Sequence, residues 1–405
     1  MMTRTLLLIL TLGCADKGSD SVVEIDCGES GDAALCTAWL MSEGTSAVID
    51  AGTPTDVTGV VLEDGVWTIR SNGLPSYTVT MEQAEINALN ARGQAATDFI
   101  SGQTTAEEGV TYEWGADIGY QSAHYGCADG AGFGWFPPGP ACPEGNEKSI
   151  QLPADPIPAA EGEECELGLG ATGWWLNGVS VYNWSDGHSY DTQGQWRNVA
   201  QIQEIYDMGP CLGHAANGDY HHHTYSDCLA EAVGDDGAAH SPIHGFAADG
   251  YPIHGPHHGA DTLAESCWMM RDYDDPEDLT GCGGTGERSC VMVDPMDPGA
   301  GTVDATSPGP TTSENVESMS GNLFSGSAGL YYEDHYFSAP CAASGGEHLD
   351  QHNGHAHDEL GYHYHVTFSF PYMPGPTLYG EVIDEQVRCG GASQGGGPGG
   401  GPPSM

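Results

Sequence analysis

The stretch Gly361-Tyr-His-Tyr-His-Val-Thr-Phe-Ser-Phe370 alternates strictly between two kinds of side chain. Aromatic or aliphatic residues occupy every second position, and the positions between them hold histidine, threonine or serine. This period of two predicts a β-strand with one buried aromatic face that ends in Phe368 and Phe370. On the other face His363 and His365 lie roughly 6.5–7 Å apart along the chain, so their imidazoles can point at one ligand.

A second copy of this pattern lies upstream, at Gly218-Asp-Tyr-His-His-His-Thr-Tyr225. The matching residues are Tyr220 with Tyr362, His221 with His363, and His223 with His365. His222 takes the place of Tyr364, and a Gly-His pair before each copy supplies His214 and His355. The repeat predicts either two halves of one site or two similar sites.

The composition predicts a mainly β protein. The chain has 405 residues, with 60 glycines and 25 prolines against eight phenylalanines, which is typical of loop-rich β proteins. We expect a single large, loop-rich, disulfide-linked β domain at residues 59–390, whose two halves a pseudo-twofold axis could relate. Residues 14–58 are expected to form a tether and an N-terminal cap, and the Gly- and Pro-rich residues 391–405 a disordered tail.

The charge balance restricts the partners of the chain. Nine basic residues against 58 acidic ones give a net charge of −49. Such a surface repels nucleic acid and anionic lipid head groups and attracts cations. The alternative explanation for most of these carboxylates is solvation alone, as in proteins from saline surroundings. The sequence does not identify a protein partner.

The N-terminus resembles a bacterial lipoprotein signal. Arg4 provides a positive charge, Leu6 to Leu12 provide a short apolar core, and Gly13-Cys14 ends the segment. We therefore expect residues 1–13 to be removed and Cys14 to be lipidated, which anchors the protein in the bacterial cell envelope. The alternative is a plain secretory signal. Cys14 is the only expected membrane contact.

The remaining twelve cysteines form an even set, which in an exported chain predicts disulfides. Cys211 with Cys228 would enclose the first histidine strand, and Cys282 with Cys290 would close a small loop. Oxidised cysteines cannot act as thiolate ligands, so metal binding would depend on His, Asp, Glu and Tyr.

Several elements are predicted around the two copies. The pattern indicates a strand within Val60–Ile69, a helix at Met81–Ile100, a short helix at Asn198–Met208, and a strand at Leu330–Phe337. Asn-Gly and Asp-Gly turns predict hairpins at Gly173–Tyr182 and at His240–His254.

The histidines predict a transition-metal site. Imidazole is the commonest nitrogen ligand for zinc and copper, so copper or zinc is the expected cofactor. The candidate ligands are His214, His221, His223, His355, His363 and His365, with His240, His244, His254 and Asp249 as further candidates. Asp249 is also explained as the turn residue of its hairpin, which we favour. The carboxylates of Asp219, Asp350 and Asp358 are the expected partners of the ring N–H groups.

Calcium is a further candidate ion. It could be held by the acidic loop Asp272–Asp278, but this loop lacks the spacing of an EF-hand and is favoured as a solvated loop.

A set of motifs in order along the chain resembles the YHYH-domain family. They are Ser71-Asn-Gly-Leu-Pro75, Leu176-Asn-Gly-Val179, Gly213-His214, Tyr220-His-His-His223, Gly245-Phe-Ala-Ala-Asp-Gly-Tyr-Pro-Ile253, Leu349-Asp350, Asn353-Gly-His355 and Tyr362-His-Tyr-His-Val-Thr367. The resemblance implies a single exported domain and brings no settled activity. His222, His244 and His254 depart from the family pattern and add imidazoles, so this member could bind metal differently.

Three functions are consistent with these patterns. The favoured hypothesis is an envelope lipoprotein that binds copper or zinc, with His221, His223, His363 and His365 converging on one shared cation. The second is a copper oxidase or zinc hydrolase that uses the same histidines. The third is a metal-free or calcium-stabilised structural or adhesive surface domain, in which tyrosines and histidines form a hydrogen-bonded network.

Overall fold

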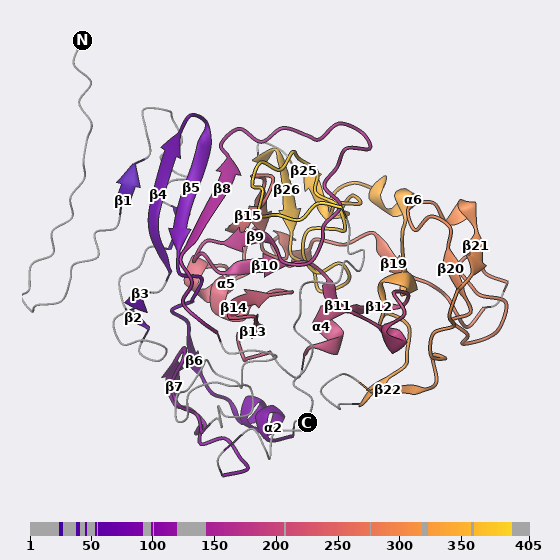
Figure 1. Cartoon of the computed structure of the whole chain (residues 1–405), viewed down its shortest axis with the longest axis horizontal. Helices are drawn as coiled ribbons and strands as arrows, with labels where there is room; N and C mark the ends of the chain where they lie inside the picture. The colour runs from indigo at the N-terminus through magenta and orange to yellow at the C-terminus, as the bar shows by residue number, and fades with distance from the viewer. Residues whose placement is uncertain are drawn as a thin grey trace, which may run out of the picture.

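An eight-stranded sheet lies at the centre of the computed structural model (Figure 1). The structure describes residues 24–26, 38–40, 45–46, 53–54, 56–91, 99, 101–119, 143–205, 208–275, 277–317, 323–357 and 360–390. The strands follow the order β13 (Gly213–Ala216), β14 (Asp219–His222), β10 (Ser180–Tyr182), β9 (Ala171–Trp175), β15 (Ile243–Ala247), β16 (Pro252–His254), β26 (Tyr362–His365) and β25 (Gly354–Ala356). The predicted mainly β fold is confirmed.

The sheet consists of two halves with the same topology. In each half a hairpin, β9–β10 or β15–β16, pairs in parallel with a histidine strand, β14 or β26. An antiparallel Gly-His strand, β13 or β25, follows at the edge. The central strands β9 and β15 are antiparallel, as a pseudo-twofold axis between them requires.

The register shows which residues are equivalent. Val181 pairs with His222 in the first half, and Ile253 pairs with Tyr364 in the second. The hairpin Gly173-Trp-Trp-Leu-Asn-Gly-Val-Ser-Val-Tyr182 thus matches Gly245-Phe-Ala-Ala-Asp-Gly-Tyr-Pro-Ile-His254 residue for residue. The Asn-Gly and Asp-Gly turns fall at the same place, so both predicted hairpins are confirmed.

A glycine precedes the histidine of each edge strand because a tyrosine ring lies against it. A Cβ atom on Gly213 would lie 2.5 Å from the hydroxyl of Tyr220 and 2.4 Å from the ring of His222, and one on Gly354 would lie 2.5 Å from the hydroxyl of Tyr362. These distances are shorter than van der Waals contact, so a side chain at either position would displace the rings beside it. The two Gly-His pairs are therefore a packing requirement repeated in both halves.

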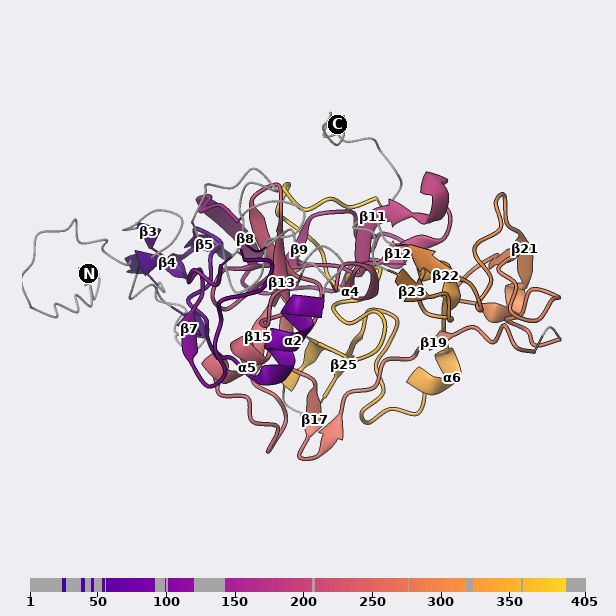
Figure 2. The ribbon, with the colours of Figure 1, turned by 90° about the horizontal axis from the view of Figure 1, so that it is seen from below.

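A second sheet packs beside the first. It contains β1 (Glu24–Asp26), β4 (Val57–Glu63), β5 (Val66–Ser71) and β8 (Lys148–Pro153), seen in indigo to magenta in Figures 1 and 2. Trp67 and Ile69 of this sheet share one buried core with Trp175 and Tyr364 of the central sheet. This shared core stabilises the contact of the two sheets, because apolar burial contributes about 25 cal/mol per Å².

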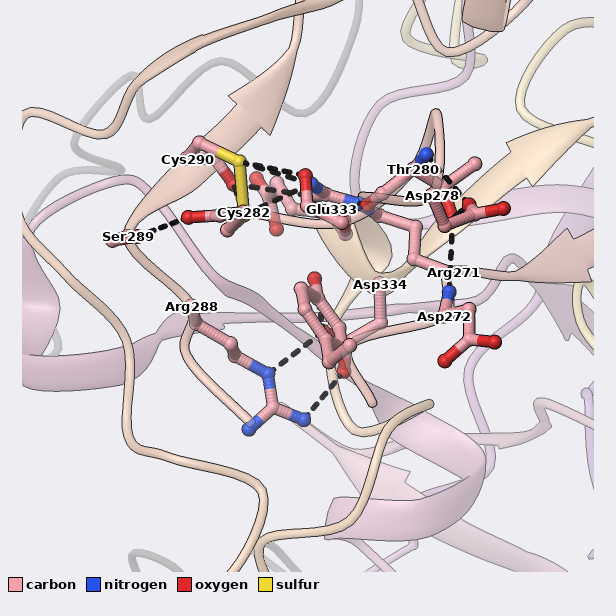
Figure 3. Close-up of a disulfide and its surroundings, with 12 residues drawn as sticks. Arg271, Asp272, Asp278, Thr280, Cys282, Arg288, Ser289, Cys290, Glu333 and Asp334 are labelled. Atoms are coloured by element: carbon pink, nitrogen blue, oxygen red, sulfur yellow. Dashed lines mark hydrogen bonds and ion pairs between the residues drawn. A yellow bond between two sulfur atoms is a disulfide. The ribbon is translucent and has the colours of Figure 1, made fainter. Parts of the chain in front are cut away.

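Residues 260–340, called the arm below, extend from the opposite side of the central sheet and are drawn in orange in Figures 1 and 2. Its strands are β18 (Thr262–Leu263), β19 (Trp268–Met270), β20 (Cys290–Met292), β21 (Thr302–Asp304), β22 (Asn315–Glu317), β23 (Leu323–Ser325) and β24 (His335–Phe337). A buried pair holds the arm together: Arg288 donates to both carboxylate oxygens of Asp334, at 2.7 and 2.9 Å (Figure 3).

The remaining described elements are short. They are β2 (Thr45–Ser46), β3 (Thr53–Pro54), β6 (Thr78–Thr80), α2 (Gln83–Ala91), β7 (Thr111–Glu113), β11 (Ser185–Ser189), η2 (Tyr190–Thr192), β12 (Arg197–Val199), α4 (Ala200–Gln203), α5 (Asp227–Val233), β17 (His257–Gly259), η3 (Pro298–Ala300), η4 (Tyr332–Asp334) and α6 (Ala339–Ala342). No helix within these described parts has the length and apolar character needed to cross a membrane.

Disulfides join residues close and distant in sequence. Both proposed pairs, Cys211–Cys228 and Cys282–Cys290, are present. Figure 3 shows the second one beside Arg271, which donates to the carbonyl of Cys290 at 2.9 Å. Cys165–Cys389 and Cys267–Cys341 complete the four disulfides of the described residues. The predicted lipidation site Cys14, the predicted tail 391–405 and most of the predicted tether 14–58 lie outside the described residues.

Some predicted elements differ from the observed ones. The strand at Gly361–Phe370 ends at His365, so Phe368 leaves the sheet and is 57% exposed instead of buried. The alternating sequence pattern continues past His365, but no described strand pairs with residues 366–370. A 3-10 helix at Tyr332–Asp334 interrupts the strand predicted at Leu330–Phe337.

Of the predicted helix at 198–208, the described residues form one regular turn, Ala200–Gln203. The helix α2 occupies the first half of the predicted Met81–Ile100, and residues 92–98 lie outside the described part.

Candidate metal centres

Three groups of histidines among the described residues could each hold a metal ion. The first triad is His214, His221 and His223; the second is His240, His363 and His365; the third is His258, His355 and His357. Within each triad one nitrogen of every ring lies within 4.8 Å of the others. The first triad belongs to one half of the sheet, and the other two belong to the second half.

The two histidine strands orient their rings by the same hydrogen bonds. His221 Nδ1 lies 2.9 Å from the carbonyl of Asp219, and His363 Nδ1 lies 3.0 Å from the carbonyl of Gly361, in each case two residues earlier. A carbonyl oxygen can only accept, so each Nδ1 carries the proton. In a neutral imidazole the opposite nitrogen, Nε2, is then a lone pair that is free to bind a metal.

The first triad brings two such lone pairs face to face. The Nε2 atoms of His221 and His223 are 3.0 Å apart. His223 Nδ1 donates to the carbonyl of Asn183 at 2.5 Å, so it has the same tautomer as His221. Two acceptors at this distance repel each other unless a proton or a cation lies between them.

Glu204 is the fourth group of this site. One of its carboxylate oxygens, Oε2, lies 3.2 Å from Nε2 of His214 and 3.2 Å from Nε2 of His223, although neither contact has hydrogen-bond geometry. In a tetrahedral site with bonds of about 2.0–2.1 Å, neighbouring donor atoms lie about 3.3 Å apart. The three separations observed among the four groups, 3.0, 3.2 and 3.2 Å, are close to this value and are compatible with edges of a coordination tetrahedron.

Burial and neighbouring charges shift the pKa values of the groups at the first triad in opposite directions. Burial, together with the neighbouring rings, holds the pKa of His221 well below its ordinary value. Burial also lowers the pKa of His223, but its contact with Glu204 outweighs this and raises the pKa. Burial would raise the pKa of Glu204, yet His214 and His223 lower it to about 2. The carboxylate is therefore charged and available to bind either a metal or a protonated His223.

The second triad repeats the facing lone pairs without a carboxylate. His240 and His363 place their Nε2 atoms 3.2 Å apart, and the Nδ1 atom of each donates to a backbone carbonyl. His365 Nδ1 donates to the carbonyl of Gly255 at 2.7 Å, and its buried Nε2 has no hydrogen-bond partner. Burial lowers the pKa of His363 to about 3 and also lowers the pKa values of His240 and His365. A proton is therefore unavailable to bridge these rings at neutral pH.

The third triad lies directly beside the second. The ring centroid of His355 is 5.0 Å from that of His363 and 5.2 Å from that of His365. His357 is likewise 5.2 Å from His240. Burial lowers the pKa of His355 to about 4, and its Nε2 has no hydrogen-bond partner. The second half of the sheet thus gathers six potential ligands in one cluster.

The hypothesis of one cation shared by His221, His223, His363 and His365 is wrong. Four strands lie between β14 and β26 in the sheet. With about 4.8 Å between neighbouring strands, the two His-x-His pairs are roughly 24 Å apart. The alternative of two similar sites is the one that the structure supports, and all six primary candidate ligands lie in the three triads.

Of the four further candidate ligands, two lie in or beside the triads and two lie outside them. His240 belongs to the second triad, and the ring of His254 lies 4.6 Å from that of His363. His244 lies outside the triads, because its Nε2 pairs with the carboxylate of Asp235 at 2.9 Å. Asp249 also lies outside them: it is the turn residue of its hairpin and accepts the hydroxyl of Tyr364 at 2.5 Å.

The extra imidazole of His222 is part of the buried core and does not belong to a triad. Because side chains alternate along β14, His222 points to the face opposite His221 and His223. Its Nδ1 accepts the indole N–H of Trp175 at 2.7 Å. Burial lowers the pKa of His222 to about 3, so the ring stays neutral there.

The predicted carboxylate partners of the rings are replaced by backbone carbonyls. Asp219 uses its side chain to accept from Tyr182 at 3.1 Å and to pair with Lys148. Asp350 accepts the hydroxyl of Tyr362 at 2.9 Å. Asp358 lies outside the described residues. In the described part of the chain, the Nδ1 atoms of His221, His223, His363 and His365 contact main-chain carbonyls, whereas the carboxylates of Asp219 and Asp350 have other partners.

Glu204, His258 and His357 were not among the predicted ligands. His355-x-His357 has the same spacing as the two signature pairs, so this pattern could have identified His357. Nothing in the sequence singles out Glu204, which follows the single turn of α4.

Calcium finds little support in the described residues. It prefers oxygen ligands, whereas the three groups found there are entirely histidine. In the acidic loop, Asp272 accepts the backbone N–H groups of Asp274 and Asp275. These internal bonds agree with the solvated loop that was favoured.

Comparison with known proteins identifies one family. The family described as YHYH protein matches residues 149–378, more than half of the chain, which include all three triads. No curated protein and no solved structure matches the chain.

Proposed function

The chain belongs to the YHYH protein family, and from this premise we propose that it binds transition-metal ions, copper or zinc, in the cell envelope. The facing Nε2 lone pairs of His221 with His223 and of His240 with His363 support the proposal most strongly. Imidazole donors favour zinc and copper over calcium or magnesium. The strongly acidic composition would concentrate cations near the protein.

The proposed location follows from other features. The apolar segment ending at Gly13-Cys14 supports export and lipidation at Cys14, with the envelope membrane as the anchor. Disulfides such as Cys211–Cys228 agree with an oxidising compartment. Labelling with a radioactive fatty acid, compared between the native chain and Cys14→Ser, tests the anchor. Incorporation that persists in Cys14→Ser would refute it.

Metal analysis tests the binding function. The protein should be purified without chelators, and its zinc and copper content measured per chain. We expect His221→Ala/His223→Ala to lose only the metal of the first triad, and His363→Ala/His365→Ala to lose only metal from the second half of the sheet. His348→Ala is the matched control, because this half-buried histidine pairs with Glu265 outside the triads.

The competing explanation is a metal-free network of hydrogen bonds and protonated histidine. It predicts metal contents near zero that do not differ among these proteins after zinc or copper has been added in excess and removed by gel filtration. Circular dichroism of each variant verifies that loss of metal does not follow from loss of the fold.

A further inference from the structure

The three triads differ in how many groups surround the expected ion. The first triad is closed: its three histidines are at most 2% exposed, and Glu204 provides a fourth donor. A buried site with four protein ligands is typical of structural zinc, because no position remains for a substrate or water. An ion held by this triad and Glu204 would therefore have no coordination position open to an incoming molecule.

The second and third triads are more open. His240 and all three histidines of the third triad are half-buried. His355 also lines an open hollow of about 340 Å³, together with Asp350, Tyr362 and Tyr379. The rings of Tyr362 and Tyr379 stack there at 3.7 Å and form part of its wall. Small molecules in solution can thus reach the edge strand that carries His355.

The rings of these two triads lie as close to one another as the rings within the second triad do, where the centroids are 5.0–5.1 Å apart. The ring centroids of His355 and His363, which belong to different triads, are 5.0 Å apart, and those of His240 and His357 are 5.2 Å apart. In proteins that use two metal ions together, the ions lie about 3.5–4 Å apart. Ions held by two such adjacent triads would therefore be neighbours.

The number of donors leaves room for a further ligand. Two four-coordinate ions require eight donors, whereas the two triads supply six imidazoles, since each histidine offers one ligand nitrogen. The neighbouring His254 would raise the number to seven. At least one position is left for water, hydroxide or a small anion.

We propose that the second and third triads form one two-metal centre that is open to small exogenous ligands, whereas the first triad holds an isolated, closed ion. This inference rests on the metal-binding function proposed above and assigns different roles to its sites. The equivalent strands of one duplicated sheet thus carry a structural site at one edge and a reactive site at the other.

Loading with Cu(II) tests the pairing. Adjacent Cu(II) ions couple magnetically, so the electron paramagnetic resonance spectrum of the fully loaded chain should integrate to fewer spins than its copper content and show a half-field transition. His258→Ala/His357→Ala should remove the half-field transition and bring spins and copper into agreement. His221→Ala/His223→Ala should retain the transition.

Azide tests the open position. It should change the visible spectrum of the copper-loaded His221→Ala/His223→Ala protein, which keeps only the proposed pair. It should leave unchanged the spectrum of a variant that keeps only the first triad, His363→Ala/His365→Ala/His258→Ala/His357→Ala.

Three separate spins in the fully loaded native chain, with no half-field transition, would overturn the two-metal centre while leaving metal binding intact. An azide response confined to the first triad would overturn the assignment of roles. Neither copper nor zinc bound at any of the triads would refute the proposed function itself, and the two failures are therefore distinguishable.

Discussion

The Nδ1 atoms of His223 and His365 donate the same hydrogen bond at opposite ends of one sheet. The acceptor of His223 is the carbonyl of Asn183 at 2.5 Å, and that of His365 is the carbonyl of Gly255 at 2.7 Å. Each acceptor directly follows the strand that pairs in parallel with the histidine strand. The duplicated fold therefore fixes the tautomer of each ring and leaves the lone pair of its Nε2 available to a metal ion.

Glu204→Gln should weaken metal binding at the first triad only. The amide keeps the shape of the carboxylate but removes the negative charge that faces Nε2 of His214 and His223. We expect the dissociation constant of this site to rise at least about 10-fold, as for the loss of a neighbouring charged group. Competition with a chelator measures it, and the exposed Glu163→Gln is the matched control. An unchanged dissociation constant would exclude Glu204 as a ligand.

Tyr364→Phe should reduce stability without reducing metal content. The hydroxyl of Tyr364 donates to the buried carboxylate of Asp249, on the face opposite His363 and His365. Its loss should lower the free energy of unfolding by about 2 kcal/mol, the usual contribution of a hydrogen bond to a charged group. Urea unfolding measures the change, with the half-buried Tyr336→Phe of the arm as control. A fall in bound metal would show that the two faces of β26 are coupled.

Arg288→Met should destabilise the arm. It leaves Asp334 buried without its cation, because Arg288 donates to both oxygens of that carboxylate. Removing one member of such a pair costs about 3–5 kcal/mol. Arg197→Met, which breaks the more exposed contact with Glu333, should cost much less. Hydrogen exchange of the arm would locate the effect, and equal protection in both variants would contradict it.

Acid should destabilise the metal-free protein partly through His335. Burial lowers the pKa of this ring to about 4 in the folded state, below its unfolded value. The unfolded chain therefore binds a proton more tightly, and stability is lost as the pH falls from about 6.5 towards 4.

The measurement compares urea unfolding at pH 7 and pH 4.5 for the native chain and His335→Gln. The variant should lose roughly 2–3 kcal/mol less over this interval, as a shift of that size implies. The other buried histidines titrate in both proteins, so their contributions to the pH dependence of the unfolding free energy cancel in the comparison. Identical pH dependence would show that His335 does not contribute.

The local structure of the sheet could be predicted from the sequence. Alternation identified the faces of the strands at His363 and His221, and the Asp249-Gly250 turn located a hairpin correctly, because these signals depend on neighbouring residues. The order of the strands depends on pairing between distant segments. The sequence alone therefore could not tell one shared site from two sites separated by four strands.

The carboxylate beside the first triad also could not be predicted from the sequence. Glu204 reaches His214 through the position of a short turn, α4, and not through any periodic pattern. The pairing of the twelve cysteines could not be fixed from the sequence either. The two suggested pairs, Cys211–Cys228 and Cys282–Cys290, join residues only 17 and 8 positions apart, whereas Cys165–Cys389 spans 224.

Anomalous X-ray scattering from crystals grown with zinc tests the central claim most directly. Data collected on both sides of the zinc absorption edge should place a zinc peak about 2.0–2.1 Å from Nε2 of both His221 and His223. A second peak should lie at the same distance from Nε2 of both His240 and His363. Facing rings without zinc at either pair, in a well-ordered crystal with zinc in excess, would contradict the account.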